Sequence, residues 1–510
     1  MKKKICMLLT LTMLTVSMAG CSSSDTSSTG NDSSSSGGST TESSNGGTGD
    51  LSNQEPYTVV MKYPGDSSSE DLAAISAAAS AITEELYNTS IEVQRSGWGT
   101  YFTEITLALT SGEKLDLFYE NRATYVSAAS SGQILEVGQY FDEYGPDLRN
   151  VISDSSWNTT TLDGGIYAFP ANKETSVSYG FIFNKEMADA TGIDYSKITT
   201  EAEMEELLVA VKELYPDTYP IVSDMGSMYT AVALDDLGDD FGVLMDMNST
   251  DLLVEDWYAT DRFRELCELH YKWSQMGLIM PDASSNSDST TTLISAKKAF
   301  GFYQNTKPGI EIESQNASGV EMATITLTDT WTSTTRVDIL WMIPYSCEAP
   351  ERVVQVVNEI YTNPELQTIL VDGIEGTHYE YINDEKTMIS YPEGVNGTNT
   401  GYIAYPWAWL NQMITPVWEG NEEDLWEQTI VWNESATVSI ANGFVWDNSM
   451  VSNEVTACWN VYEQYADALI CGDVDPAVYL PEYLQALESA GVHAIVEEKQ
   501  RQLDEWYATK

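Results

Sequence analysis

Aromatic, carboxylate and amide side chains stand at or just after the ends of several predicted strands, and these residue types suit the binding of a sugar. A sugar offers rim hydroxyls to carboxylates and amides, and C–H faces to aromatic rings. Many of the 14 Trp and 29 Tyr must fill a core, so their positions are more informative than their number. The residues so placed are Trp98, Tyr119, Glu120, Asn121, Tyr303, Gln304, Trp331, Trp407 and Trp409. Trp407 and Trp409 share one face if their segment is extended.

Alternating strands and helices in the first part of the chain predict how such residues are brought together. Strand patterns occur at residues 57–63, 91–93 and 116–120, and helix patterns at 71–87 and 102–109. This alternation predicts βαβ units and a mostly parallel sheet. Because ligands lie beyond the carboxyl ends of such strands, we expect the candidates between residues 98 and 121 near a cleft.

The stretch from Asp163 to Lys185 has the pattern of a strand that is interrupted and then resumed. A glycine pair marks a turn, a short apolar run stops at Pro170, and strand-like residues return after position 176. The polar residues in between are Asn172, Lys173 and Glu174. The pattern fits a crossing between two lobes, with these three groups facing a cleft, and equally an ordinary hairpin of one sheet.

Several segments resemble extracellular solute-binding proteins of carbohydrate ABC transporters. Gly165-x-Tyr167-Ala168-x-Pro170, with Glu174 four residues later and then Phe183-Asn184-Lys185, is similar to the first hinge of that family. Other family-like segments are Ser111–Asp116, Ser295–Phe302 and the polar loop around Trp331, which resembles the second hinge. The helix that starts at Pro350, with residues 363–365 and 373–379, resembles the late helices and the third crossover. The motifs between residues 439 and 506 resemble a domain of unknown function of LplA/LipO-type lipoproteins of Gram-positive bacteria.

The resemblance implies an α/β, periplasmic-binding-protein-like fold of type II, with two lobes, mixed sheets flanked by helices and a hinged cleft. It implies a first lobe of residues 54–170 and 331–375 and a second of residues 171–330 and 376–510. It also implies a monomer that captures a carbohydrate by closing around it, without catalysis or a cofactor, and delivers it to an ABC permease. Glu174 stands where sugar-binding relatives carry a ligand-contacting glutamate, and Tyr303 where they commonly place a sugar-facing aromatic.

The N-terminus predicts export and lipid attachment. Three lysines precede an apolar stretch of residues 5–17, which is too short to span a bilayer, and Met18-Ala19-Gly20-Cys21 follows. This resembles a lipobox in which Cys21 is lipidated, so residues 1–20 are expected to be a signal peptide; the alternative is a plain secretory signal. Residues 21–53 are rich in Ser and Gly and predict a flexible tether on the outer face of the cytoplasmic membrane.

The charge of the chain and its motifs indicate which other partners and activities are disfavoured and which stay open. A formal net charge of −54, spread along the chain, argues against nucleic acids and anionic membranes as partners. The aspartates at 235, 236, 239 and 240 lack EF-hand spacing and are expected to form a solvated loop and no metal site. Pairing of Cys458 with Cys471 stays open. One alternative to a sugar is a peptide or another solute, and Arg122 is the one arginine near the predicted mouth of the cleft that could bind a peptide carboxylate. The alternative to a binding protein is a surface glycoside hydrolase.

Overall fold

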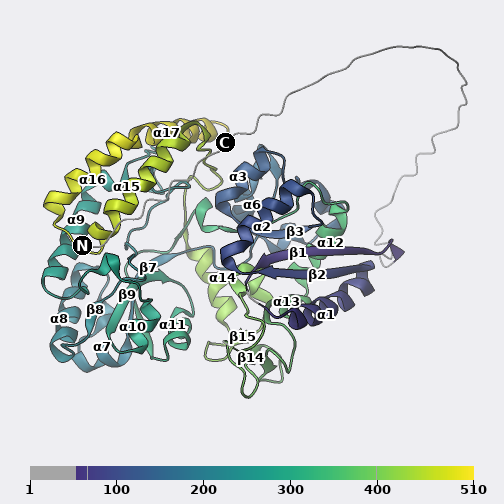
Figure 1. Cartoon of the computed structure of the whole chain (residues 1–510), viewed down its shortest axis with the longest axis horizontal. Helices are drawn as coiled ribbons and strands as arrows, with labels where there is room; N and C mark the ends of the chain where they lie inside the picture. Colours follow the sequence, from purple (N-terminus) through teal and green to yellow (C-terminus); the bar gives the residue numbers. More distant parts are fainter. Residues whose placement is uncertain (1–52, 66, 398) are drawn as a thin grey trace, which may run out of the picture. The chain divides into compact units, whose positions relative to one another are not determined.

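The computed structural model describes residues 53–65, 67–397 and 399–510 (Figure 1). The chain divides into two units, residues 1–49 and 50–510, and the second holds every described residue. The expected signal peptide, Cys21 and nearly all of the tether therefore lie outside the described residues. None of the described helices is both long and apolar enough to cross a membrane.

A five-stranded sheet forms the centre of the first lobe. Its strands are β1 (Tyr57–Pro64), β2 (Thr89–Ser96), β3 (Leu117–Asn121), β6 (Phe169–Pro170) and β12 (Ile339–Met342). Helices around it are α1 (Ser69–Tyr87), α2 (Trp98–Ser111), α3 (Arg122–Ser130), α12 (Pro350–Thr362) and α13 (Pro364–Asp372). The order is β2-β1-β3-β12-β6, with the first three strands parallel and β12 antiparallel to both of its neighbours. The predicted mixed sheet is confirmed.

A four-stranded sheet forms the centre of the second lobe, in the order β10-β7-β9-β8. Its strands are β7 (Ser178–Asn184), β8 (Tyr219–Ile221), β9 (Ala299–Thr306) and β10 (Met322–Thr326). Helices of this lobe are α7 (Lys185–Thr191), α8 (Glu205–Leu214), α9 (Asp261–Gln275), α10 (Thr290–Ser295) and α11 (Ile310–Ser318). On α8, Leu207, Leu208 and Val211 are buried against the core of this lobe, while Leu214 at the end of the helix is exposed.

Three C-terminal helices extend the core of the second lobe. They are α15 (Ser452–Ile470), α16 (Pro476–Ala490) and α17 (Val492–Tyr507), coloured yellow in Figure 1, where α15 and α16 lie beside α9. Their buried Leu469, Leu487 and Leu503 belong to the same hydrophobic cluster as Phe263 of α9. Cys458 and Cys471 are buried free thiols. Burial of these apolar side chains fixes the C-terminal region to the second lobe.

Shorter elements complete the described part of the chain. They are α4 (Phe141–Tyr144), α5 (Leu148–Val151), α6 (Asp154–Thr159), α14 (Leu425–Ser435), β4 (Thr161–Leu162), β5 (Gly165–Ile166), β11 (Trp331–Thr332), β13 (Glu380–Tyr381), β14 (Met388–Ser390), β15 (Val417–Trp418) and β16 (Thr437–Val438). Two of them, β11 and β16, pair in parallel outside both main sheets.

Three segments carry the chain between the lobes. The first crossing (171–177) joins β6 to β7, the second crossing (327–338) joins β10 to β12, and the third crossing (419–436) joins β15 to β16. The crossing interpretation of the stretch around residue 170 is thus confirmed, and the hairpin alternative is wrong, because β6 and β7 belong to different sheets. The second hinge around Trp331 is also confirmed.

The crossings are hydrogen-bonded to one another. Val177 and Trp331 exchange two backbone hydrogen bonds of 2.8 and 2.9 Å. The Asn433 side chain of α14 donates to the carbonyl of Lys173 at 2.9 Å and accepts from the N–H groups of Thr175 and Ser176 at 3.0 and 3.2 Å. With the β11–β16 pair, these bonds tie all three crossings side by side.

Two expected boundaries are wrong. Residues 373–379 do not cross between lobes, because His378 lies against Asp71 of α1 at 3.1 Å and Ile374 packs on the first core. Residues 376–510 do not all belong to the second lobe either, since Tyr402 and Trp409 are buried in the first core. The apolar residues of this segment complete the first lobe before the third crossing begins.

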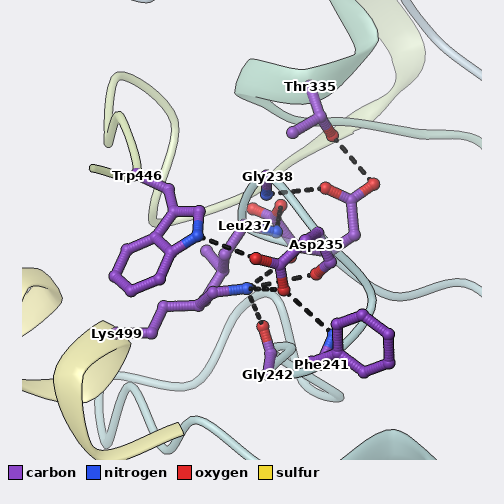
Figure 2. A network of polar contacts seen from close by, with 10 residues as sticks. Asp235, Leu237, Gly238, Phe241, Gly242, Thr335, Trp446 and Lys499 are labelled. Atoms are coloured by element: carbon purple, nitrogen blue, oxygen red, sulfur yellow. Dashed lines mark hydrogen bonds and ion pairs between the residues drawn. The ribbon is translucent and has the colours of Figure 1, made fainter. Parts of the chain in front are cut away.

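The acidic loop (235–242) is pinned from one side by the C-terminal region, as Figure 2 shows. Lys499 of α17 has a fully buried side chain, and its ammonium group donates to the Asp239 carboxylate at 2.8 Å and to the carbonyls of Asp236, Asp239 and Gly242 at 3.2, 3.1 and 2.8 Å. The Trp446 indole N–H donates to the other Asp239 oxygen at 2.8 Å. The prediction of a solvated loop is therefore wrong.

The other side of the acidic loop is joined to the second crossing. The Asp236 carboxylate accepts from the Thr335 hydroxyl at 3.2 Å and from the Arg336 guanidinium at 3.0 Å. In the described part of the chain, no group of three or more His, Cys, Asp or Glu side chains is arranged to hold a metal ion. Two of the four aspartates of this loop, Asp236 and Asp239, are thus paired with an arginine and a lysine of the protein itself.

Replacing Lys499 by methionine should lower the free energy of unfolding by about 3–5 kcal/mol, because the Asp239 carboxylate would stay buried without its cation. Urea denaturation followed by tryptophan fluorescence measures this loss. Arg501 is the matched control, since it lies on the same helix but is 51% exposed. Its replacement by methionine should lower the stability by about 1 kcal/mol or less. Equal losses in the two variants would contradict a structural role for the buried lysine.

Candidate functional site

An ionic cluster lies where the first crossing meets the second lobe. The Glu174 carboxylate lies 3.3 Å from Nζ of Lys307 and 3.7 Å from Nζ of Lys173, and Lys173 lies 3.7 Å from Asp338 of the second crossing. Burial by itself would raise the pKa of Glu174, but the two ammonium groups outweigh it and lower that pKa. The carboxylate is therefore ionised at neutral pH. These residues and Gln304 line a cavity of about 220 Å³, the hinge cavity.

A cavity of about 440 Å³, the aromatic cavity, lies next to it in the second lobe. Rings from β7, β9, β11, α15 and the intervening loops line it: Tyr179, Tyr229, Trp257, Tyr258, Tyr303, Trp331 and Tyr462. Tyr229 is 46% exposed, and its ring centre lies 6.1 Å from that of Tyr179. Tyr229 and Arg336 line both cavities, so the two cavities are contiguous.

Asp240 gives the aromatic cavity a carboxylate with unused hydrogen-bonding capacity. It lines the cavity wall, and no residue in the described ranges donates a hydrogen bond to its side chain. Burial, assisted by repulsion from Asp236 and Asp239, raises the pKa of Asp240 to about 6. Because Asp240 is half-buried on the cavity wall, a ligand hydroxyl placed here can donate to its carboxylate.

Trp98 and Trp407 form an exposed aromatic pair on the first lobe. Trp98 is the first residue of α2, just past the carboxyl end of β2, where the sequence analysis expected it. Its ring stacks on Trp407 with centres 5.8 Å apart, and Tyr405 and Tyr119 contact it edge-on at 6.0 and 6.1 Å. Because Trp98 keeps 37% of its surface exposed, the pair offers a ring face of the kind that packs against a sugar.

The two cavities bring together five of the predicted site residues. Lys173, Glu174 and Gln304 line the hinge cavity, and Tyr303 and Trp331 line the aromatic cavity. Tyr303 is only 3% exposed and Trp331 only 1%. Tyr303 lies within β9, which continues to Thr306, so the expectation that it follows the strand is wrong. The rings of Tyr303 and Trp331 therefore line the aromatic cavity but leave little surface free for a ligand.

The placement of Trp409 at a ligand site is wrong. Its side chain is fully buried in the first core, with ring centres 5.2 Å from Trp341 and 4.6 Å from Tyr63. Residues 406–408 form a 3₁₀ turn and are not extended. Trp407 therefore meets Trp98 while Trp409 enters the core, and the two tryptophans do not share one face.

The predicted residues on β3 are mostly buried. Tyr119 is 3% and Glu120 5% exposed, so neither faces a cleft, contrary to the prediction. One Glu120 oxygen accepts from the N–H of Asn121 at 3.1 Å, and burial raises the pKa of Glu120. Asn121 is half-buried at the strand end. Asn172 is also half-buried, and its side chain donates to that of Asn411 at 3.0 Å.

Sequence reasoning missed Tyr229, Asp240, Lys307 and Arg336. All four lie in segments without helix or strand periodicity, so only their residue types could have drawn attention to them. Arg122 is not the one arginine near the site, because Arg336 lines both cavities. The guanidinium of Arg122 donates to the carbonyls of Val337 and Thr159, at 2.9 Å each. The pairing of Arg336 with Asp236 balances its charge.

Comparison with known proteins agrees with this geometry. Residues 65–366 match the family described as bacterial extracellular solute-binding protein, and residues 440–508 match a domain of unknown function, DUF3502. A carbohydrate ABC transporter substrate-binding protein of Streptococcus pneumoniae serotype 4 is 26% identical over 468 residues, which cover 89% of this chain and 91% of that protein.

Solved structures share the fold. An N-glycan transport solute-binding protein (NgtS) from Streptococcus pneumoniae is 24% identical, with a TM-score of 0.79 over 88% of this chain and 99% of that one. The same protein in complex with Man5GlcNAc gives 25% identity and a TM-score of 0.68 over 89% and 99%. The alginate-binding protein AlgQ2 gives 14% identity and a TM-score of 0.61 over 89% and 99%.

The two-lobed α/β fold, the three hydrogen-bonded crossings and the match over residues 65–366 lead to one assignment. This chain belongs to the bacterial extracellular solute-binding protein family, whose members are the extracellular substrate-binding components of ABC transporters.

Proposed function

We propose that this protein captures an oligosaccharide outside the cell and passes it to the permease of an ABC importer. The observation that carries the proposal is the aromatic cavity, in which the exposed ring of Tyr229 and the unpaired carboxylate of Asp240 lie beside the crossings. A sugar uses both groups, since its C–H faces pack on the ring and its hydroxyls donate to the carboxylate. The ionised Glu174 supplies a second acceptor in the adjoining cavity.

Relatives support a carbohydrate and make N-glycans the first class to test. The pneumococcal relative is described as a carbohydrate ABC transporter substrate-binding protein. The structure at 25% identity is that of an N-glycan transport protein with Man5GlcNAc. Neither identity is high enough to transfer a particular sugar, so the proposal for this chain stops at the class of oligosaccharides.

Capture would proceed by closure of the lobes about the crossings. A sugar that touches the Trp98–Trp407 pair of the first lobe and the aromatic cavity of the second favours the arrangement in which both contacts form. Asn121, Asn172, Lys173 and Gln304 remain proposed polar contacts along the crossings. The expected monomer suffices for this mechanism, because all proposed contacts come from one chain.

A peptide or another solute is the alternative ligand, and hydrolysis of a bound sugar is the alternative activity. Recognition of a peptide carboxylate would need an arginine with spare charge. Arg336, which lines the hinge and aromatic cavities, is already paired with Asp236 at 3.0 Å, and this favours a sugar in those two cavities. Arg122, whose guanidinium donates to two backbone carbonyls, is the arginine that a peptide would have to use. We further propose attachment to the membrane through lipid on Cys21, since two acyl chains on one cysteine hold a protein stably.

Thermal melting of residues 53–510 with mono- and oligosaccharides tests the proposal. A bound sugar at 100 times its Kd should raise the free energy of unfolding by about 2.7 kcal/mol. A stability increase with one sugar class, and recovery of that sugar intact, would support binding without catalysis. A melting temperature that rises only with peptides would overturn the carbohydrate assignment. Degradation of the sugar during the assay would support the alternative activity of a glycoside hydrolase.

Replacing Glu174 by glutamine should weaken oligosaccharide binding about 10- to 100-fold, since hydrogen bonds to a charged group contribute about 1.5–3 kcal/mol. Isothermal titration calorimetry measures the change. Glu321 is the control: it pairs with Lys185 and is 65% exposed, so the glutamine variant at that position should bind as the wild type does. Unchanged affinity in the Glu174 variant would remove this residue from the site.

Lowering the pH from 7 to 5 should weaken oligosaccharide binding about tenfold. The pKa of Asp240 is about 6 in the free protein, and a donating hydroxyl favours the ionised form, so protonation opposes binding. Glu174 has a lowered pKa and stays ionised over this range. Calorimetry at both pH values should show a much smaller pH effect in Asp240→Asn. An equal pH effect in that variant would assign the titration to another group.

A further inference from the structure

A third cavity, of about 910 Å³, lies between the first lobe and the C-terminal region. Helix α3 lines it from the first lobe, from Arg122 and Val126 to the serines at its C-terminal end, and residues 444–449 with Val455 and Trp459 line it from the other side. The second crossing contributes Thr334, Thr335 and Arg336. We call it the C-terminal cavity. Its size is at the upper end of the roughly 300–1,000 Å³ typical of small-molecule sites.

The two walls of the C-terminal cavity carry different chemistry. Trp459 is 37% exposed, although its ring is held edge-on against Phe241 and Tyr462 at 5.0 and 5.2 Å. The opposite wall offers the hydroxyls of Ser127, Ser130 and Ser131 on and just after α3. An aromatic surface facing a row of hydroxyls matches a carbohydrate, which has apolar faces and a polar rim.

The C-terminal cavity is continuous with the aromatic cavity. Asp236, Asp240 and Arg336 line both, and Trp459 of one contacts Tyr462 of the other. The Asp240 carboxylate, which lacks a donor, therefore stands at the junction. A ligand held at Asp240 can extend from the aromatic cavity along Trp459 without leaving a continuous lined surface.

The wall of the C-terminal cavity is held in place by buried contacts. Lys499 fixes the acidic loop, and Trp446 donates to Asp239 within the same network (Figure 2). At Gly238, where φ is 113°, a side chain would approach the Cβ atom of Trp446 to 3.0 Å, so the loop packs closely on the C-terminal region. A preformed wall loses little conformational entropy when a ligand binds.

We propose that the C-terminal cavity is a second carbohydrate subsite, which takes the outer sugar units of an extended oligosaccharide whose inner units occupy the aromatic cavity. The subsite rests on the proposed function above. Through this subsite the C-terminal domain would recognise the length of the bound oligosaccharide. Trp459 is the packing surface, the serines of α3 are the opposing polar wall, and Asp240 joins the two subsites.

Calorimetry of residues 53–510, one compact unit, with a branched oligomannose N-glycan and with its core disaccharide tests the subsite. The Trp459→Ala variant should bind the long glycan about 2- to 10-fold more weakly and the disaccharide as the wild type does, since the variant loses one aromatic contact with the outer sugar units. Tyr479→Ala is the control, because Tyr479 is 41% exposed on α16 and lines none of the three cavities.

A bulky side chain on the opposite wall gives an independent test. Arginine at position 130, at the C-terminal end of α3, suits the helix dipole, and Ser130→Arg should obstruct the long glycan and spare the disaccharide. Wild-type affinity for the long glycan in both variants would overturn the subsite while leaving the proposed function intact. No binding of either sugar by the wild-type protein would overturn the proposed function and the subsite together.

Discussion

The mutual hydrogen bonding of the three crossings is the constraint on which the rest of this structure depends. Two sheets with separate cores are joined by segments that leave one lobe and enter the other, and the backbone groups of these segments need partners. The Val177–Trp331 pair, the β11–β16 pair and the Asn433 side chain supply them. The hinge and aromatic cavities lie against these segments, so the proposed ligand site is located at the point where the lobes are joined.

Two of the charged groups at the crossings lie against opposite charges. Glu174 lies between two lysines, and Arg336 lies against Asp236. Asp236 belongs to a loop that Lys499 holds from the C-terminal side. The C-terminal domain is therefore connected to the second crossing through one acidic loop. In the same loop, the Asp240 carboxylate accepts no hydrogen bond from the described residues. Asp240 lines two of the three cavities.

The fold was predictable where the information is local, and the site was predictable only in part. Strand and helix periodicity predicted the parallel strands of the first sheet. The interrupted strand at Pro170 fitted a crossing and a hairpin equally, and the family resemblance decided between them. The difference between Trp407 and Trp409 depends on a 3₁₀ turn, and residue type does not reveal it. The acidic loop appeared solvated because its cation, Lys499, is 260 residues away from Asp239. Tyr229 and Asp240 lie in irregular loops, where no pattern marks a binding residue.

The central claim is that an oligosaccharide contacts both lobes and so favours their closure about the crossings. Small-angle X-ray scattering of residues 53–510, with and without a saturating oligosaccharide, tests this claim most directly. We expect a smaller radius of gyration for the protein with bound oligosaccharide than for the free protein. A radius of gyration that stays constant while calorimetry shows the site to be filled would contradict capture by closure.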